Sequence, residues 1–258
     1  VPIPIFYCAE CGKDIVTPET IQHVAALFRG HGSNIWFDKT ADELAPEGLC
    51  CPVCGHRHFT KENDIMDVWF DSGSTHAAVL DGRDYLRFPA DVYLEGGDQY
   101  RGWFQSSMLT SITVKGAAPY KQIITHGWTV DGEGKAMHKS LGNAIGPEEI
   151  IKDYGADLLR LWVASADYTQ DMRISGEIMK QLSQAYLKIR NTARYMLGNL
   201  YDFDPDADMV PVERLTELDR YALHRFNELA RAAQAAYERY EFHGVYRAVY
   251  NFCVVDMS

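Results

Sequence analysis

The hydrophobic and polar positions follow two different patterns along the chain. From about residue 14 to residue 166, short apolar runs alternate with amphipathic stretches, whereas after about residue 170 apolar residues recur at helical spacing in longer segments. The first pattern is typical of a parallel α/β fold of the doubly wound type, and the second predicts a helical bundle. In a doubly wound sheet, functional sites form at the carboxyl ends of the strands.

The predicted elements of the first part end at glycines, prolines and other turn residues. We expect strands at residues 34–37, 64–70, 91–95 and 122–126, and helices at residues 18–29, 99–114, 147–154 and 156–166. Thr17 is a suitable N-cap for a helix whose first residue is Pro18. The helix at 99–114 is predicted to bury an apolar face formed by Trp103, Phe104, Met108, Leu109 and Ile112.

The second part reads as helices joined by one irregular connection. The apolar periodicity predicts helices at residues 175–200, 215–240 and 242–257, with a connection rich in Pro and Asp at residues 201–211. The chain stops inside the last amphipathic pattern, and its first residues lack both a starting Met and the basic region of a signal peptide. We therefore expect both ends to be cuts within a longer protein.

Composition places the chain among globular proteins. It has 258 residues, of which 47% are hydrophobic and 24% charged, and no apolar run approaches the length of a membrane span. The net charge of −11 argues against a nucleic-acid module that works by bulk electrostatics, although a local basic face stays compatible with it. Arg190 and Arg194, four residues apart on a predicted helix, are candidates for contact with RNA phosphates or for an ordinary solvated face.

Two Cys-x-x-Cys-Gly sequences lie in the first quarter of the chain. Their cysteines are Cys8, Cys11, Cys51 and Cys54. Two such pairs complete a tetrahedral site for Zn²⁺, and four thiolates leave no open position for catalysis, so the predicted site is structural. Cys50 is an alternative ligand to Cys51, and reduced buried thiols are the alternative to a metal site.

Residues 131–143 combine glycines with a cluster of hydrogen-bond donors. The donors are Lys135, His138, Lys139 and Ser140, and Gly142 and Asn143 close the segment. Glycine allows close approach of the backbone, and lysine neutralises charge that develops when a phosphate bond breaks. The pattern predicts a mobile loop that closes on polyphosphate; the alternative is a solvated surface loop.

Polar and aromatic residues gather where the predicted strands end. The residues concerned are Trp69, Glu95, Gly96, Asp98, Gln99, Trp103 and His126. Glu95 can pair with an ammonium group, and Asp98 and Gln99 can bind hydroxyl or carbonyl groups. Trp69 and Trp103 can form the walls of an apolar pocket, or they can be core aromatics. Together with the lysine loop, these groups suit an aminoacyl-adenylate.

Five segments resemble the bacterial isoleucyl-tRNA synthetases, which are class I aminoacyl-tRNA synthetases. The segments are residues 67–76, 93–104, 137–143, 155–165 and 189–195. The resemblance covers essentially the whole chain. It implies the second half of a Rossmann-like catalytic domain with a zinc-ribbon-like insertion, followed by an α-helical bundle. It further implies a zinc-binding connective segment at 1–63, the catalytic half with the lysine loop at 64–166, and a stem-contact segment with the start of a helical anticodon-binding domain at 167–258.

The resemblance also implies residue roles. Glu95, Gly96, Asp98 and Gln99 match the family's contacts to the aminoacyl-adenylate, and Trp69 and Trp103 match the walls of the isoleucine pocket. The ATP loop comprises Lys135, Met137, His138, Lys139 and Ser140. Lys139 matches the catalytic second lysine of the Lys-Met-Ser-Lys-Ser signature, from which Ala136 and His138 depart.

The function implied is the ligation of L-isoleucine to tRNA(Ile) through an isoleucyl-adenylate. The substrates implied are L-isoleucine, tRNA(Ile) and ATP with Mg²⁺, with Zn²⁺ as a structural metal, in a monomeric cytoplasmic protein without a membrane partner. We expect this chain alone to be inactive, because the first half of the nucleotide site is missing from it. The alternatives are a zinc-ribbon RNA-binding or scaffold module without catalysis, and a synthetase for another branched-chain amino acid.

Overall fold

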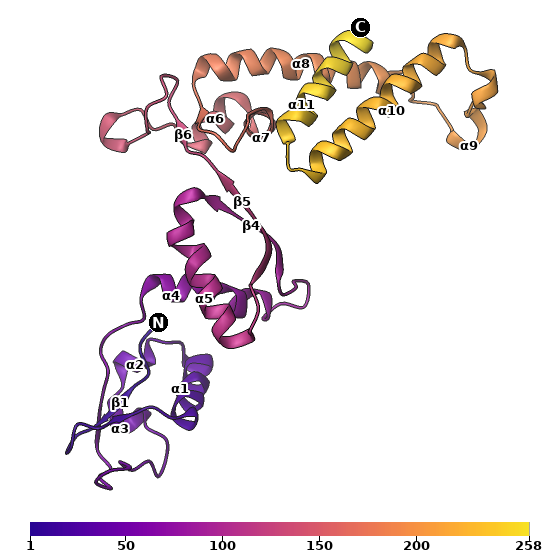
Figure 1. Ribbon diagram of the computed structural model, residues 1–258. Coiled ribbons are helices and arrows are strands. Elements are labelled where there is room, and N and C mark those ends of the chain that lie inside the picture. The colour runs from indigo at the N-terminus through magenta and orange to yellow at the C-terminus, as the bar shows by residue number, and fades with distance from the viewer. Residues whose placement is uncertain (258) are drawn as a thin grey trace. The chain divides into compact units, whose positions relative to one another are not determined.

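The computed structural model describes residues 1–257, except for the side chain of Lys139. The chain forms two compact units, each described by itself below. The first unit comprises residues 1–93 and 98–123, and the second comprises residues 94–97 and the chain from residue 124 onward. Figure 1 shows the order of the elements along the chain. The three-part domain division predicted from the sequence stays a prediction.

The first unit begins with a small antiparallel sheet covered by helices. Its strand order is β2 (Asp14–Ile15), β1 (Phe6–Cys8) and β3 (Phe59–Lys61), and its helices are α1 (Pro18–His31), α2 (Ile35–Asp38) and α3 (Ala41–Leu44). Phe6 pairs with Ile15 on one side and with Lys61 on the other. Thr17 caps α1 as predicted, and its hydroxyl accepts a hydrogen bond from the N–H of Thr20. The core of this sheet and its helices centres on Phe6 and Trp36, both fully buried.

Two predicted strands of this unit are wrong. Asn34 is the N-cap of helix α2 (Ile35–Asp38), because this turn buries Trp36 and directs its Nε1–H to the carbonyl of Glu62 at 2.8 Å. A short apolar run cannot distinguish a strand from a buried helical turn. Residues 64–70 contain only an isolated bridge between Ile65 and Pro2, after which Asp67 caps helix α4 (Val68–Gly73).

Helix α4 packs against helix α5 (Trp103–Lys115). Three further elements flank this pair: η1 (His76–Leu80), η2 (Gly97–Arg101) and strand β4 (Ala90–Gly96), which forms a two-stranded sheet with β5 (Tyr120–His126). The two helices approach closely at Gly73, where an added Cβ would lie 2.8 Å from the backbone carbon of Ser106. Strands β4 and β5 confirm the strands predicted at 91–95 and 122–126.

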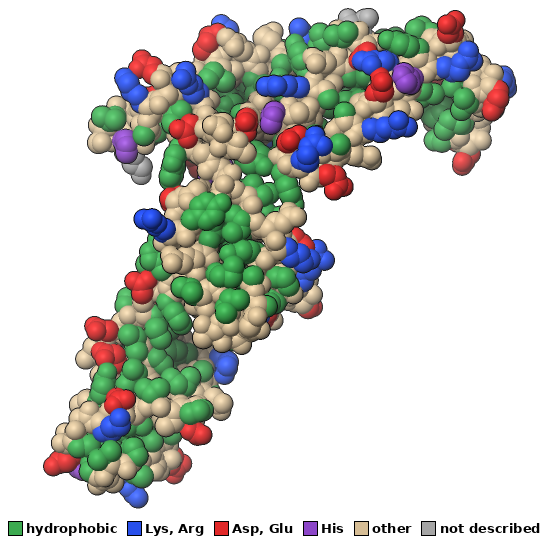
Figure 2. Space-filling model, viewed as in Figure 1, with side chains coloured by type: hydrophobic (Ala, Val, Ile, Leu, Met, Phe, Trp, Pro, Cys, Tyr) green, Lys and Arg blue, Asp and Glu red, His purple; other side chains and the backbone are tan. Residues whose placement is uncertain are grey.

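The buried face of α5 differs from the predicted one. Phe104, Ser107 and Ser111 are buried, whereas Leu109 and Ile112 are exposed. The side of α5 that faces α4 carries Ser106 and Thr110, and Thr110 Oγ1 donates to the carbonyl of Gly73 at 3.0 Å. The buried Ser111 instead donates to the carbonyl of Ala117 at 2.7 Å. Figure 2 shows hydrophobic side chains grouped on the visible surface of the segment that carries α4 and α5.

The second unit contains a short parallel strand pair and a set of helices. Strand β6 (Thr129–Val130) pairs in parallel with β7 (Met172–Arg173). The helical elements are η3 (Lys139–Leu141), α6 (Pro147–Tyr154), α7 (Ala156–Ser165), α8 (Gly176–Gly198), α9 (Pro205–Asp208), η4 (Val212–Arg214), α10 (Glu217–Glu238), α11 (Phe242–Asn251) and η5 (Phe252–Asp256). The predicted fold class, an α/β part followed by helices, is confirmed.

The core of the second unit joins α6, α7 and α8. Its buried residues are Ile150, Leu158, Trp162, Ile174, Met179 and Leu182. The predicted helices at 147–154 and 156–166 are confirmed, and the predicted connection at 201–211 carries the single turn α9. Among residues 1–257, none of the helices combines the length and apolarity needed to cross a bilayer.

Candidate functional site

The four knuckle cysteines converge on one point. The Sγ–Sγ distances are 3.5 Å for Cys8–Cys54, Cys11–Cys51 and Cys11–Cys54, and all four sulfurs lie within 4.8 Å of one another. Thiolates about 2.3 Å from a tetrahedral Zn²⁺ lie about 3.8 Å apart, so the cluster fits such an ion. Cys50 is exposed and lies outside the cluster, so the geometry selects Cys51.

Backbone geometry explains the convergence. Gly12 and Gly55 adopt φ values of +68° and +74°, which other residues rarely adopt, and their N–H groups donate to the carbonyls of Cys8 and Cys51 at 2.9 Å. The N–H of Val53 points at Cys51 Sγ at 3.4 Å. Hydrogen bonding from the backbone of Cys54, together with that of Val53, lowers the pKa of Cys51 to about 6. At Cys51 this favours the thiolate, which is the form that binds metals, whereas burial and the neighbouring thiols raise the pKa of Cys54 to about 12.

The two candidate pocket tryptophans lie on α4 and at the start of α5, in the first unit. Trp69 is 46% exposed, so it is not a core residue. Trp103 is half-buried, and its Nε1–H donates to the carbonyl of Ser72 at 3.0 Å. The ring of Tyr93 stacks on Trp103 with a centroid distance of 4.2 Å and an interplanar angle of 1°. Gln99 Oε1 accepts from the backbone N–H of Trp103 at 2.9 Å, and Gln99 Nε2 donates to Asp98 at 3.0 Å.

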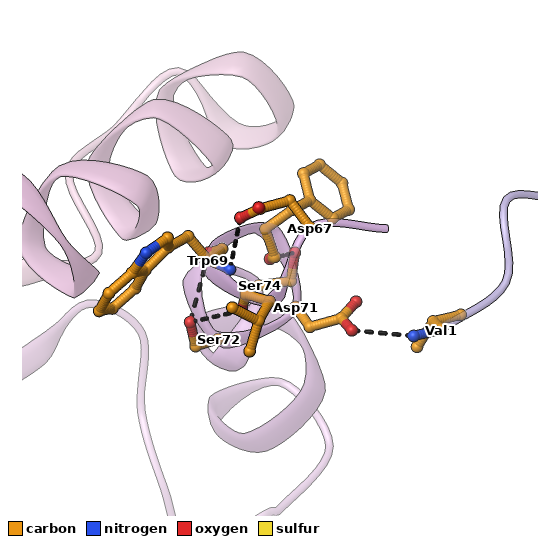
Figure 3. Close-up of polar contacts among 8 residues, drawn as sticks. Val1, Asp67, Trp69, Asp71, Ser72 and Ser74 are labelled. Carbon is orange, nitrogen blue, oxygen red and sulfur yellow. Dashed lines mark hydrogen bonds and ion pairs between the residues drawn. The ribbon is translucent and has the colours of Figure 1, made fainter. Parts of the chain in front are cut away.

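Short-range hydrogen bonds fix the turn that carries Trp69. Asp67 Oδ1 accepts from the N–H of Trp69 at 2.7 Å, which caps α4 (Figure 3). The Ser72 hydroxyl donates to the carbonyl of Val68, and the Ser74 hydroxyl donates to that of Phe70, both at 2.9 Å. Figure 3 also shows Asp71 pointing away from Trp69 to the amino group of Val1, at 2.8 Å. The backbone position of Trp69 is therefore set locally by α4.

Glu95 lies beside His126 in the second unit. Glu95 Oε2 is 3.9 Å from His126 Nε2 and accepts from the N–H of Gly96 at 3.1 Å. His126 Nδ1 lies 2.8 Å from the carbonyl of Gly127, so Nδ1 carries a proton and donates it there. Glu95 is exposed, and its carboxylate can receive a cationic group.

The lysine loop is an organised turn held by two residues. Asp131 Oδ1 accepts from the N–H groups of Glu133 and Lys135, at 3.0 and 2.9 Å. Asn143 Nδ2 donates to Asp131 Oδ2 at 2.8 Å, and Asn143 Oδ1 accepts from the N–H of His138 at 2.9 Å. The bond from Asn143 is the main cause of a lowered pKa at Asp131.

The described donor side chains of the loop, those of Lys135, His138 and Ser140, face solvent. His138 and Ser140 are exposed, and Lys135 pairs with Glu133 at 2.8 Å. Met137 is the anchor of the loop, because it packs against the core of the second unit. The backbone of Lys139 opens η3, and its side chain lies outside the described part of the structure.

Arg190 and Arg194 lie exposed on α8. Neither makes a hydrogen bond or ion pair with the residues that the structure describes. Sequence reasoning did not single out Asp131 or Tyr93. The Asp-Gly pair at 131–132 is a turn signal that points to Asp131, whereas the sequence carries no comparable signal for the stacking of Tyr93 on Trp103.

Comparison with known proteins assigns the class. Residues 1–175 match the family described as tRNA synthetases class I (I, L, M and V), and residues 219–258 match the anticodon-binding domain of tRNA ligase. The chain therefore belongs to the class I tRNA synthetase family.

Within that class, the chain is similar to isoleucine–tRNA ligases. It is 59% identical to the one from Caldanaerobacter subterraneus subsp. tengcongensis and 60% identical to the one from Caldicellulosiruptor saccharolyticus, over 100% of the chain in both cases. The chain spans 28% of the length of each of these relatives.

A solved structure supports the fold. The crystal structure of the ternary complex of Agrobacterium radiobacter K84 agnB2 LeuRS, tRNA and LeuAMS superposes with a TM-score of 0.74 at 21% identity. The match covers 99% of the chain and 34% of that LeuRS.

Proposed function

We propose that this chain is part of an enzyme that joins L-isoleucine to tRNA(Ile) through an isoleucyl-adenylate formed from ATP. The observation that carries the proposal is identity of about 60% to isoleucine–tRNA ligases over every residue of the chain. In this proposal, residues 1–63 form a zinc-binding connective segment and residues 64–166 the second half of the catalytic domain. Residues 167–258 contact the tRNA stem and begin the anticodon-binding domain.

The amino acid is recognised by an apolar wall and a carboxylate. Trp69 and Trp103 bind the aliphatic side chain, and the exposed carboxylate of Glu95 binds the ammonium group. Asp98 and Gly96 lie within three residues of Glu95 in the sequence and contact the adenylate. The Gln99 side chain contributes by holding the first N–H of α5, which carries Trp103.

The lysine loop binds the phosphates of ATP. Lys139 stabilises negative charge on the α-phosphate and the departing pyrophosphate while the isoleucine carboxylate attacks, and Lys135 adds charge nearby. Asn143 donates to Asp131 and accepts from the N–H of His138, and these two bonds shape the turn without using the lysine side chains. Catalysis is then positioning and charge stabilisation, with no covalent enzyme intermediate.

The cysteine cluster holds Zn²⁺ in a structural role. Cys8, Cys11, Cys51 and Cys54 supply four thiolates, which complete the coordination and leave no position for substrate. The exposed Arg190 and Arg194 contact tRNA phosphates. The enzyme acts as a monomer, and the chain by itself does not activate amino acid.

The test is ATP–pyrophosphate exchange by the full-length protein that carries this chain. Glu95→Gln removes the negative charge at the ammonium site, and we expect it to reduce isoleucine-dependent exchange by at least about 100-fold. Glu213→Gln, at an exposed glutamate on η4, is the matched control and leaves exchange unchanged. No isoleucine-dependent exchange by the unsubstituted protein, together with salt-dependent RNA binding that Glu95→Gln leaves unchanged, would instead indicate a non-catalytic RNA-binding module.

A further inference from the structure

Gly102, the buried residue directly before α5, lies against the ring of Trp69. A Cβ added at Gly102 would lie 2.9 Å from Trp69 Cη2 and 3.1 Å from Cζ3. It would also lie 2.7 Å from Gln99 Oε1. Carbon atoms that are not bonded approach favourably only to about 3.5 Å, so at least one of these side chains has to move if position 102 carries a methyl group.

The obstructing atoms are the ends of side chains. This differs from Gly73, where an added Cβ would meet the backbone of Ser106 at 2.8 Å. Trp69 is 46% exposed, so its ring is free to swing aside. Gln99 Oε1 is held by the backbone N–H of Trp103 at 2.9 Å, so a methyl group at position 102 displaces the Trp69 ring more readily than Gln99 and leaves the packing of α4 on α5 in place.

The other wall of the proposed pocket is held differently. Trp103 is fixed by its hydrogen bond to the Ser72 carbonyl at 3.0 Å and by the stacked ring of Tyr93. No side-chain hydrogen bond of Trp69 is seen in the described structure, and the indole lies on the bare backbone of Gly102. The position of the Trp103 ring is thus set by a hydrogen bond and by stacking, whereas the position of the Trp69 ring depends on the absence of a side chain at residue 102.

We infer that Gly102 is a specificity-determining residue, which sets the position of the Trp69 ring and thereby the shape of the pocket for a branched aliphatic side chain. The inference rests on the proposed function, in which the two tryptophans bind isoleucine. Isoleucine exceeds valine by one methylene, and this group adds affinity only when the pocket wall contacts it closely. Displacement of Trp69 in either direction lowers this discrimination, because a narrower pocket excludes the methylene and a wider pocket loses its contact.

The first test uses the full-length protein and Gly102→Ala. We expect kcat/KM for isoleucine in ATP–pyrophosphate exchange to fall by about tenfold or more, mainly through KM, and the ratio of isoleucine to valine to fall with it. Gly198→Ala is the matched control, because a Cβ at this residue of α8 meets no atom within 4 Å. An unchanged isoleucine-to-valine ratio in Gly102→Ala would overturn the inference.

Two backgrounds identify the side chain through which the methyl group acts. Phenylalanine lacks the outer ring atoms of tryptophan, so Gly102→Ala is expected to change the ratio less than about twofold in Trp69→Phe. Gln99→Ala removes the other obstructing atom. In that background we expect Gly102→Ala to lower the isoleucine-to-valine ratio as much as it does in the unsubstituted protein. The reverse pattern would assign the effect to Gln99 and contradict the inference.

A measurement on the chain itself separates this inference from the proposed function. The chain has five tryptophans, so labelling with 5-fluorotryptophan gives five ¹⁹F NMR resonances that substitution to phenylalanine can assign. We expect Gly102→Ala to shift the Trp69 resonance and leave that of Trp162, in the second unit, unchanged. An unmoved Trp69 resonance contradicts the inference even if isoleucine is the substrate. A moved resonance without isoleucine-dependent exchange in the full-length protein contradicts the proposed function and, with it, the specificity role.

Discussion

The cysteine cluster and the lysine loop both come from short sequence motifs that contain glycine, but their side chains are arranged differently in the structure. In the cluster, four side chains from two distant segments converge within 4.8 Å and two of them are buried. In the loop, the side chains of Lys135, His138 and Ser140 face solvent, and the turn is held by the carboxylate of Asp131 and the amide of Asn143. A structural metal is enclosed by all of its ligands once the protein has folded, whereas a loop that closes on phosphate keeps its donor groups accessible to the ligand.

The largest expected effect is on the cluster. Structural Zn²⁺ contributes about 10–16 kcal/mol of apparent binding free energy in zinc-finger peptides, so Cys11→Ser, which removes one of four ligands, should abolish stoichiometric zinc binding. We expect the β1–β3 sheet to lose protection in hydrogen exchange as well. Metal analysis and exchange mass spectrometry check both.

The neighbouring cysteine provides the control. Cys50 is exposed and outside the cluster, so Cys50→Ser should retain one zinc per chain. Equal zinc content in Cys11→Ser and Cys50→Ser would show that the cluster is not the metal site, and the contrast between the cluster and the loop would no longer hold.

The next largest effect is expected from a substitution in the lysine loop, which should change the activity of the full-length protein but not its stability. Lys139→Ala in the full-length protein should lower the rate of adenylate formation by about 100-fold, because a preorganised charge at a developing anion contributes about 2.7–4 kcal/mol. The melting temperature should not change. Lys152→Ala, at an exposed lysine on α6, serves as the control in single-turnover measurements. A large stability loss in Lys139→Ala would show that the loop is a structural element like the cluster.

A smaller effect is expected at the turns of the cluster. Gly55 has φ of +74°, and a left-handed conformation costs a residue with a Cβ about 1–2 kcal/mol. Gly55→Ala should therefore destabilise the unit by about this amount in urea unfolding while zinc still binds. Gly30→Ala, within α1 and with no atom within 4 Å of the added Cβ, should stabilise slightly instead. Equal changes in the free energy of unfolding for Gly55→Ala and Gly30→Ala would contradict the explanation that left-handed glycines bring the cysteines together.

The smallest effect concerns the loop turn. Asn143→Ala removes the bonds to Asp131 and to the N–H of His138, and a typical hydrogen bond contributes about 0.5–1.5 kcal/mol. We expect faster hydrogen exchange at residues 135–141 and no change in global unfolding. Unaltered exchange there would show that the loop is held by other contacts.

The sequence predicts well those features that depend on near neighbours. The Thr17 cap and helix 147–154 are confirmed, because capping and periodicity act within a few residues. The predicted cysteine cluster is also confirmed, because each of its two knuckles is a local motif that the sequence shows. The strand predicted at 34–37 is wrong because the burial of Trp36 against distant residues determines its conformation. The predicted buried face of α5 is wrong for a similar reason, since residues distant in the sequence bury Ser107 and Ser111 while Leu109 and Ile112 stay exposed.

The candidate site shows the same limit. The residue types at 69, 95 and 103 suggest a pocket from the sequence, but the contact of Gly102 with Trp69 joins two segments that no periodicity connects. The same holds for Tyr93, which stacks on Trp103 from strand β4. Such contacts emerge only when α4 and α5 are packed.

The central claim is that this chain belongs to an enzyme that activates isoleucine. The most direct measurement is ATP–pyrophosphate exchange by the full-length protein with isoleucine, valine and leucine in parallel, with the 258-residue chain alone as a reference. We expect exchange with the full-length protein that is strongest with isoleucine, and none with the chain alone. Exchange that is strongest with leucine or valine, or no amino-acid-dependent exchange at all, would contradict it.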